Sequence, residues 1–279
     1  MPQASPAGKP SRQADVTILF ANVASLSESF MKHVETVRKE VQSVCLAEHK
    51  KAEECIGDAQ TKWRKLGFKS WWSQAVRTGN GGVSGGTSIH GHRCYVASRL
   101  DWARVDGVTH LPKCPENWTG ILIKGYVNFV LITAYFKDGI GMKDQNLELL
   151  GEIRAWISAT GIPWIIVADW NCTPDELLES GGMEDMKGHI VVPKDCNMTC
   201  SMGKGRMLDY VMVSETLLNL ITVEPDYDVP AKPHIGIRIK LQLNILDDKV
   251  KVLAAAPVPT VPAVRKADHR VNMEIRKTP

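Results

Sequence analysis

Polar side chains that could bind a cation or move a proton stand at or just after the ends of several apolar runs. Asn22 and Glu48 follow the first two runs, Tyr135 ends a later one, and Asp169 and Asn171 follow the most hydrophobic one. A rigid sheet usually presents catalytic groups on the loops beside its strands. Carboxylate and amide oxygens are also ligands that Mg²⁺ accepts. The five side chains are therefore candidates for metal binding and acid/base chemistry.

Asp209 and His234 form a second candidate group. Asp209 opens a late apolar run, and His234 precedes the last one, 25 residues further along the chain. A carboxylate hydrogen-bonded to a histidine fixes the tautomer of the ring and raises its pKa, so that the ring can donate a proton. Taken singly, each candidate also has a structural explanation, as a turn residue, a solvated carboxylate or a core aromatic.

Ten short runs rich in β-branched and aromatic residues predict the strands that would position these groups. They are separated by glycine, proline and asparagine turns. The predicted strands cover residues 16–20, 43–47, 71–75, 83–89, 93–97, 121–124, 129–135, 164–168, 208–213 and 235–241.

Apolar residues at helical spacing predict three amphipathic helices among these strands. The predicted helices cover about residues 30–41, 56–66 and 147–157. Gly67 and Gly161 mark the ends of the second and third helices. Capping boxes at Ser25–Glu28 and Thr173–Glu176 predict the starts of the first helix and of a further one, and Ser214 starts a short helix.

Many strands with interspersed helices predict an α/β fold, a four-layer α/β sandwich of two packed mixed β-sheets flanked by helices. The predicted domain covers residues 15–246. Residues 1–14 are rich in proline, serine, glycine and lysine and are expected to form a disordered leader. Residues 247–279 are expected to form a disordered Pro/Ala-rich basic tail.

Composition narrows the class of protein. The chain has 279 residues, and its seven scattered cysteines form no disulfide framework or paired zinc knuckles. The start lacks the apolar core of a signal peptide, and no apolar run approaches the roughly 20 residues that span a bilayer. We therefore expect a soluble intracellular protein without a membrane partner. Residues 16–246 carry 25 basic and 26 acidic side chains, so any contact with nucleic acid must be local or assisted by the basic tail.

Five segments in order, FANVASL, VCLAEHK, ITAYF, IIVADWNCTPDE and GRMLDYVMVS, resemble motifs of the endonuclease/exonuclease/phosphatase superfamily. That family has an Asn-bearing first strand, a glutamate motif, a Tyr-bearing strand, G-D-x-N, R-x-D-Y and a closing S-D-H. The glycine-rich stretch 79–86 also looks like a segment of the family. The resemblance covers about residues 15–243 and includes the endonuclease domains of non-LTR retrotransposons and abasic-site endonucleases.

The resemblance implies phosphodiester hydrolysis assisted by Mg²⁺, with Mn²⁺ as an alternative cation. Glu48 would be the main ligand, and Asn22 would help through its amide oxygen or a bound water, and would also contact the substrate. Such a cation polarises the phosphate and offsets charge on the leaving oxygen. It keeps several waters and needs only one or two carboxylates.

The resemblance also implies roles for the remaining candidates. Asp169 would orient or deprotonate the attacking water, and Asn171 and Tyr135 would donate to the phosphate and so bind the substrate. His234, oriented by Asp209, would stabilise the crowded oxyanion.

Three positions depart from the family pattern. The closing motif reads Lys232-Pro233-His234, so the aspartate that usually precedes the histidine is absent. Ala24 and Ala168 replace an Asn or Asp and a Gly in the first and fourth motifs. Asp268-His269 restores an Asp-His pair, but no strand follows it. The metal site is therefore expected to be weaker than usual or the enzyme partly degenerate.

Three functions remain open. The first is a DNA endonuclease of the retrotransposon type, acting within a larger polyprotein, with the nucleus as one location. The second is a phosphatase or phosphodiesterase acting on small phosphate esters. The third is a non-catalytic module that kept the fold. Trp71-Trp72 is interpreted as core, with a stacking platform for bases as the alternative.

Overall fold

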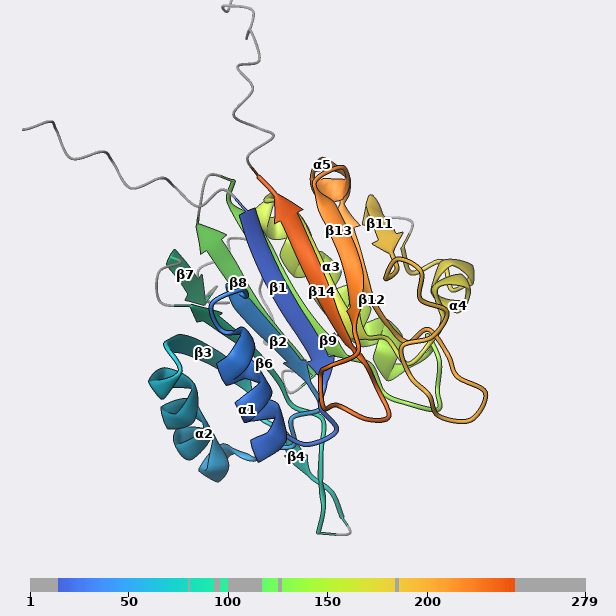
Figure 1. Ribbon diagram of the computed structural model, residues 1–279. Helices are drawn as coiled ribbons and strands as arrows, with labels where there is room; N and C mark the ends of the chain where they lie inside the picture. The colour runs from blue at the N-terminus through green and yellow to red at the C-terminus, as the bar shows by residue number, and fades with distance from the viewer. Residues whose placement is uncertain are drawn as a thin grey trace, which may run out of the picture. The chain divides into compact units, whose positions relative to one another are not determined.

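Two mixed β-sheets form the centre of the computed structural model (Figure 1). The first has six strands in the order β13-β14-β1-β2-β6-β3. Its strands are β1 (Asp15–Asn22), β2 (Ser43–Ala47), β3 (Phe68–Ser73), β6 (Thr87–His92), β13 (Ile221–Asp226) and β14 (Gly236–Gln242). β1 and β2 run parallel, and the other neighbouring pairs run antiparallel.

The second sheet repeats this plan, with the order β11-β12-β10-β9-β8-β7. Its strands are β7 (Val96–Arg99), β8 (Trp118–Lys124), β9 (Phe129–Tyr135), β10 (Trp164–Asp169), β11 (Gly188–Val191) and β12 (Asp209–Ser214). Here β9 and β10 form the parallel pair, while the remaining neighbours are antiparallel. A short hairpin, β4 (Val76–Arg77) and β5 (Val83–Ser84), stands apart.

The structure describes residues 15–79, 81–92, 96–99, 117–124, 127–183 and 186–243. The predicted leader 1–14, the tail 247–279 and the pair Asp268-His269 lie outside these residues. The described residues belong to one compact unit, Met1–Ile245. No helix among them is long and apolar enough to cross a membrane. The cysteines within the described ranges are free thiols: Cys45, Cys55, Cys172, Cys196 and Cys200.

Two of the described helices begin at a capping side chain, and one ends at a left-handed glycine. The helices are α1 (Glu28–Val37), α2 (Glu53–Lys65), α3 (Gln145–Thr160), α4 (Pro174–Glu179) and α5 (Glu215–Leu218). Thr173 and Glu176 form the predicted capping box, and Gly161 ends α3 in a left-handed conformation. The predicted box at the first helix is wrong: Ser27 is the N-cap of α1, and its hydroxyl accepts from the amide of Phe30.

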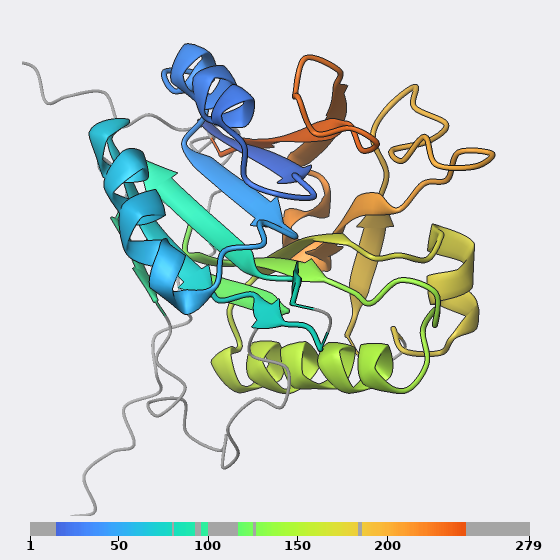
Figure 2. The ribbon, with the colours of Figure 1, turned by 90° about the horizontal axis from the view of Figure 1, so that it is seen from below.

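Apolar side chains fill three layers. One cluster, which includes Ile18, Phe129 and Val167, lies between the two sheets. A second joins the first sheet to α1 and α2, and a third joins the second sheet to α3 and α4. Figure 2 shows α1 and α2 on one outer face and α3 on the other. The predicted four-layer α/β sandwich is therefore confirmed.

The two parallel pairs bring distant parts of the chain to the same level. Asn22, the last residue of β1, is in register with Ala47, the last of β2, so Glu48 follows directly beside it. Asp169, the last residue of β10, is in register with Tyr135 on one side and Asp209 on the other. Each sheet therefore carries candidate side chains at the ends of its central strands.

Candidate active site

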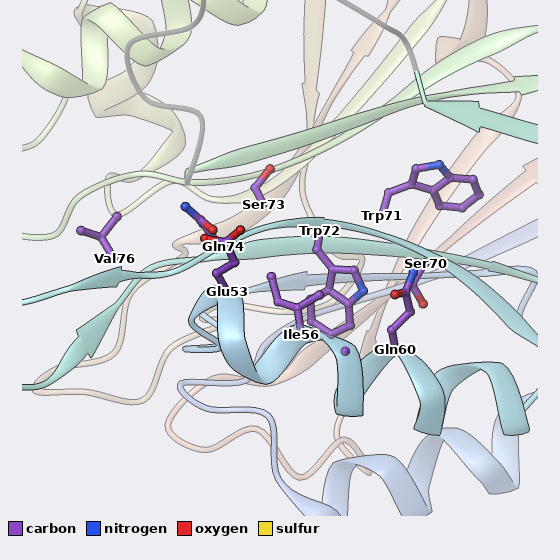
Figure 3. Close-up of a pocket in the computed structure, with 10 residues that line it drawn as sticks. Glu53, Ile56, Gln60, Ser70, Trp71, Trp72, Ser73, Gln74 and Val76 are labelled. Carbon is purple, nitrogen blue, oxygen red and sulfur yellow. The ribbon is translucent and has the colours of Figure 1, made fainter.

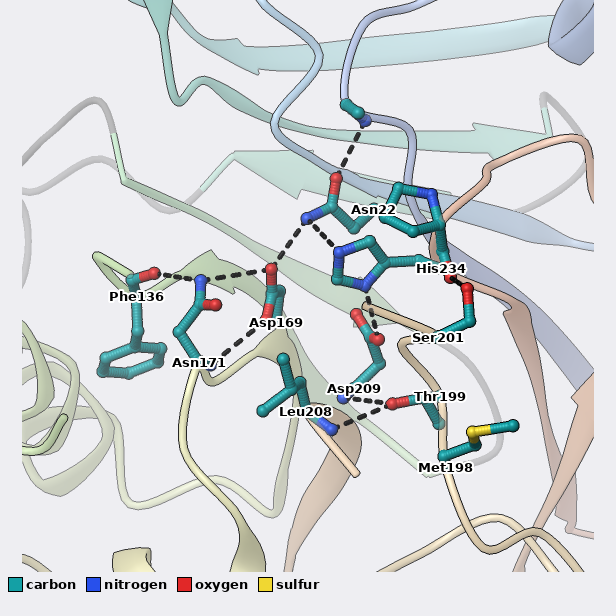
Figure 4. Close-up of polar contacts among 12 residues, drawn as sticks. Asn22, Phe136, Asp169, Asn171, Met198, Thr199, Ser201, Leu208, Asp209 and His234 are labelled. Atoms are coloured by element: carbon teal, nitrogen blue, oxygen red, sulfur yellow. Dashed lines mark hydrogen bonds and ion pairs between the residues drawn. The ribbon is translucent and has the colours of Figure 1, made fainter. Parts of the chain in front are cut away.

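Asn22, Asp169 and His234 contact one another where the two sheets meet (Figure 4). The amide Nδ2 of Asn22 donates to Oδ2 of Asp169 at 2.7 Å and lies 3.5 Å from Nε2 of His234. Its oxygen Oδ1 accepts the backbone N–H of Ala24 at 2.8 Å, which fixes the orientation of the amide because the backbone group can only donate. All three side chains are buried.

His234 is held from behind by Asp209. The ring Nδ1 lies 2.8 Å from Oδ2 of Asp209, and a carboxylate can only accept, so Nδ1 carries a proton. Asp209 is itself fixed through Thr199, whose hydroxyl oxygen accepts the backbone N–H groups of Leu208 and Asp209 at 2.9 and 2.7 Å. This arrangement turns Nε2 of His234 toward Asn22 and Asp169.

Asn171 completes the surroundings of Asp169. Its backbone N–H donates to Oδ1 of Asp169 at 3.1 Å, and its side chain donates to Oδ2 at 3.2 Å and to the carbonyl of Phe136 at 2.7 Å. Asn171 has a left-handed backbone (φ 48°), which asparagine tolerates better than most residues. Trp170 packs beneath, stacked between Phe136 and Tyr210, and this apolar floor excludes water from one side of the carboxylate.

Glu48 reaches the same site from a tightly held turn. It and Lys50 both have left-handed backbones (φ 55° and 52°). Between them the buried ring of His49 lies 3.2 Å from the carbonyl oxygens of Ser73 and Thr87 and accepts the N–H of Lys51 at 2.9 Å. The carboxylate of Glu48 forms an ion pair with Lys50 at 3.1 Å. The negative charge of Glu48 raises the pKa of both His234 and Tyr135.

Burial and neighbouring charge shift the pKa values of the central groups. Burial, reinforced by Asp209, raises the pKa of Asp169 to about 8, although His234 and the donors Asn22 and Asn171 hold it down in part. Burial lowers the pKa of His234, but the hydrogen bond and charge of Asp209 outweigh it and raise that pKa to about 9. The site therefore pairs a carboxylate that titrates near neutral pH with a histidine that stays protonated there.

Tyr135 stands at the rim, partly buried. Burial raises the pKa of its hydroxyl, and the charges of Glu48 and Asp169 raise it further, so the group stays a neutral donor. All seven candidate residues thus belong to one site, five of them linked by hydrogen bonds and two, Glu48 and Tyr135, by charge.

The donor set suits a cation. Ligand atoms of Asp169, Asp209 and His234 lie within 4.8 Å of one another and could hold a metal ion. Glu48 adds a third, partly exposed carboxylate. The oxygen of Asn22 already accepts the amide of Ala24, so only its remaining lone pair is free for a cation or a water.

The altered positions also have a structural context. Pro233 leaves the closing motif without a carboxylate, and its carbonyl oxygen instead accepts the backbone and hydroxyl groups of Ser201, both at 3.0 Å. Ala24 takes a left-handed backbone (φ 47°) and donates to Asn22. At both positions the backbone supports the loop, and no side chain there adds charge.

Trp71 and Trp72 are core residues, on opposite faces of the edge strand β3 (Figure 3). They are 7% and 9% exposed, and the ring of Trp72 packs edge-on against His49 and His90. Together with residues of α2 they line a groove of about 560 Å³. Such burial excludes a stacking platform for bases at these two residues.

Two contributors were missed from the sequence. Thr199, which fixes Asp209, lies in an irregular segment without periodicity, and nothing in the sequence distinguishes its hydroxyl from any other. Lys50, which neutralises Glu48, lies two residues after it in VCLAEHK. Glu48 and Lys50 both have left-handed backbones, and a single sequence does not reveal this conformation for residues other than glycine.

No protein-family model and no curated protein matches the chain. Solved structures do match. The endonuclease domain of TRAS1, a telomere-specific non-LTR retrotransposon, superposes with a TM-score of 0.59 at 16% identity, over 82% of this chain and 99% of that one. The AP endonuclease LMAP from Leishmania major gives 0.60 at 15% identity, over 87% and 92%.

An endonuclease/exonuclease/phosphatase family protein from Leptotrichia buccalis gives a TM-score of 0.57 at 14% identity, over 81% of this chain and 99% of that one. At these identities the likeness concerns the fold. The resemblance first seen in five short motifs is confirmed at that level, and the chain has the fold of the endonuclease/exonuclease/phosphatase family.

Proposed function

We propose that this protein is a hydrolase that cleaves phosphodiester bonds in DNA, with a divalent cation, Mg²⁺ or Mn²⁺, as cofactor. The observation that carries the proposal is the buried chain of contacts from Asp169 through Asn22 and His234 to Asp209. Burying two carboxylates and a histidine together costs stability, and perturbed groups of this kind cluster at active sites.

Asp169 acts as the base. Its carboxylate is oriented by three N–H donors and has a pKa of about 8, which suits the removal of a proton from water near neutral pH. His234, protonated and fixed by Asp209, donates from Nε2 to a phosphoryl oxygen that gains charge. Tyr135 adds a neutral donor at the same place, whereas the amide of Asn171 already donates to Asp169 and Phe136 and so orients the carboxylate.

Glu48 is the residue we assign to the cation, assisted by Asn22. When bound, a divalent cation would supply positive charge to the phosphoryl and leaving oxygens. Lys50 holds the Glu48 carboxylate in place. The absence of a carboxylate at Pro233 makes this a site of low negative charge, so we expect weak cation binding.

DNA is favoured over small phosphate esters because two of the matched structures are named as endonucleases, a retrotransposon endonuclease domain and an AP endonuclease. We accordingly propose a retrotransposon-type endonuclease, acting as part of a larger polyprotein. The non-catalytic module is the outcome to be expected if Pro233 has abolished cation binding.

Nicking of supercoiled plasmid DNA tests the proposal. The wild-type protein should nick with Mg²⁺ and not with EDTA, and Asp169→Asn should lower the rate by about 10² to 10⁴. Asp175→Asn, which makes the same change at an exposed carboxylate on α4, is the matched control and should keep full activity. Hydrolysis of small phosphate esters alone would support the phosphatase hypothesis. No hydrolysis of either substrate would support the hypothesis of a non-catalytic module.

A further inference from the structure

A small pocket opens beside the candidate active site, and we call it the Tyr227 pocket. It is lined by residues 195–199 and by Ser201, Tyr227 and Ile235, and its volume is about 250 Å³. Typical small-molecule sites hold about 300–1,000 Å³. The Tyr227 pocket is therefore suited to a single flat ring system and too small for a whole nucleotide.

The pocket shares a wall with the site. Thr199, which lines the pocket, accepts the backbone N–H of Asp209 at 2.7 Å through its hydroxyl and that of Ile235 at 2.9 Å through its carbonyl. Ser201 donates to Pro233, the residue before His234. A ligand in the pocket would thus touch residues bonded directly to Asp209 or next to His234.

The pocket exposes apolar surface that the fold does not use. Tyr227 is 67% exposed and Met198 is 48% exposed, although both side chains are held in place. The Cys196 thiol raises the pKa of the Tyr227 hydroxyl, and that thiol donates to the carbonyl of Met198 at 3.1 Å. The thioether of Met198 fills the space that a Cβ on Gly205 would need. A fixed, exposed aromatic face is a surface on which another ring can stack at little entropic cost.

The surrounding charge favours an anionic chain. Lys194, Lys204 and Lys232 are exposed on the loops that border the pocket, whereas the exposed acidic side chains there are Asp195, which lines the pocket, and Asp228. Figure 2 looks onto this end of the domain. The two loops, residues 192–208 and 227–235, lie there beside the ends of β1 and β10. The lysines would contact phosphates, while Met198, Tyr227 and Ile235 give the pocket apolar surface among its polar residues.

We propose that the Tyr227 pocket binds one unstacked nucleobase of the nucleic-acid strand whose phosphodiester lies at Asp169 and His234. The inference rests on the proposed function and adds a substrate class to it, a strand with a base free to leave its stack. A base in this pocket would hold a neighbouring phosphate in the site, so the enzyme would favour nucleic acids over small phosphate esters that carry no base.

Equilibrium binding to labelled single-stranded oligonucleotides, read by fluorescence anisotropy in an Asp169→Asn background with Mg²⁺, tests the inference without strand cleavage. Tyr227→Ala should weaken binding about 5- to 150-fold, the effect of about 1–3 kcal/mol per stacked base. Tyr227→Phe, which keeps the ring, should stay within about twofold of the parent. Leu178→Ala is the matched control, since Leu178 is 57% exposed on α4.

An abasic scan makes the test specific to stacking. Each base of the oligonucleotide is replaced in turn by an abasic spacer, and at one position the loss caused by Tyr227→Ala should disappear, because the tyrosine then has no ring to stack on. Equal binding by Tyr227→Ala and the parent, or an equal loss with every spacer, would overturn the inference. A positive scan with a protein that never nicks DNA would support the pocket and refute the proposed hydrolysis, so the two failures are distinguishable.

Discussion

The most informative perturbation is Asp169→Asn, because the pKa of Asp169 predicts a change in stability that depends on pH. In the unfolded chain this carboxyl ionises near pH 3.9, whereas in the folded protein burial raises its pKa to about 8. The folded state therefore binds a proton that the unfolded state has already lost. Stability from this group is present at low pH and is lost as the pH rises through 8.

The size of the effect follows from the same two values. Between pH 6 and pH 9 the unfolded carboxyl is ionised throughout, and the folded one loses most of its proton. Linkage then removes about 2 to 3 kcal/mol of unfolding free energy from the wild type, and Asp169→Asn, which cannot ionise, retains it. His234, whose pKa is raised to about 9, makes stability fall with pH in both proteins. Because the charge of Asp169 contributes to that raised pKa, the difference between the two proteins measures Asp169 together with its effect on His234.

Urea unfolding in EDTA at pH 6, 7, 8 and 9 measures the difference. The unfolding free energy of the wild type should fall more steeply with pH than that of Asp169→Asn. In thermal unfolding, about 1 kcal/mol corresponds to 2–4 °C in Tm for a domain of this size. Asp175→Asn should run parallel to the wild type. Parallel curves for wild type and Asp169→Asn would refute the reasoning, since they would mean that Asp169 is ionised in the folded protein at pH 6.

Other perturbations test the supports of the site. Gly86→Ala should lower the unfolding free energy by about 2–4 kcal/mol in urea titrations, because its φ is +85° and a Cβ would collide with His49; a neutral result would contradict the packing described. Lys50→Met should tighten Mn²⁺ binding about two- to fivefold by calorimetry, since Lys50 competes for Glu48; weaker binding would show that Lys50 only positions the carboxylate. Thr199→Val should cost about 1–3 kcal/mol in thermal unfolding, because two buried N–H groups lose their acceptor, and an unchanged Tm would count against it.

Strands inside the sheets were predictable from the sequence. β2 and β9 match their predicted bounds, and β10 differs by one residue, because strands covered on both faces form apolar runs. The same runs located the site, since candidate side chains stand where these strands end. Parallel pairing then placed Glu48 beside Asn22.

Two of the four edge strands of the large sheets were missed for the opposite reason. β11 and β13 lie at the edges of the two sheets, where a strand has one neighbour and is partly exposed, so its apolar signal is weak. Pro225 and Asp226 also look like a turn in the sequence, although an edge strand tolerates proline because one of its sides needs no ladder hydrogen bond. Thr199 acts through backbone groups that only the folded chain brings to it.

The pairing of β1 with β14 has a consequence for the synthesis of the protein. Asp15 is in register with Gln242, and β14 lies between β1 and β13, so the first strand made waits for the last one to complete its sheet. His234 arrives only just before that final strand. A ribosome-bound chain would thus carry Asn22, Glu48 and Asp169 without the histidine, and the proposed nuclease would stay inert until translation had passed the whole domain.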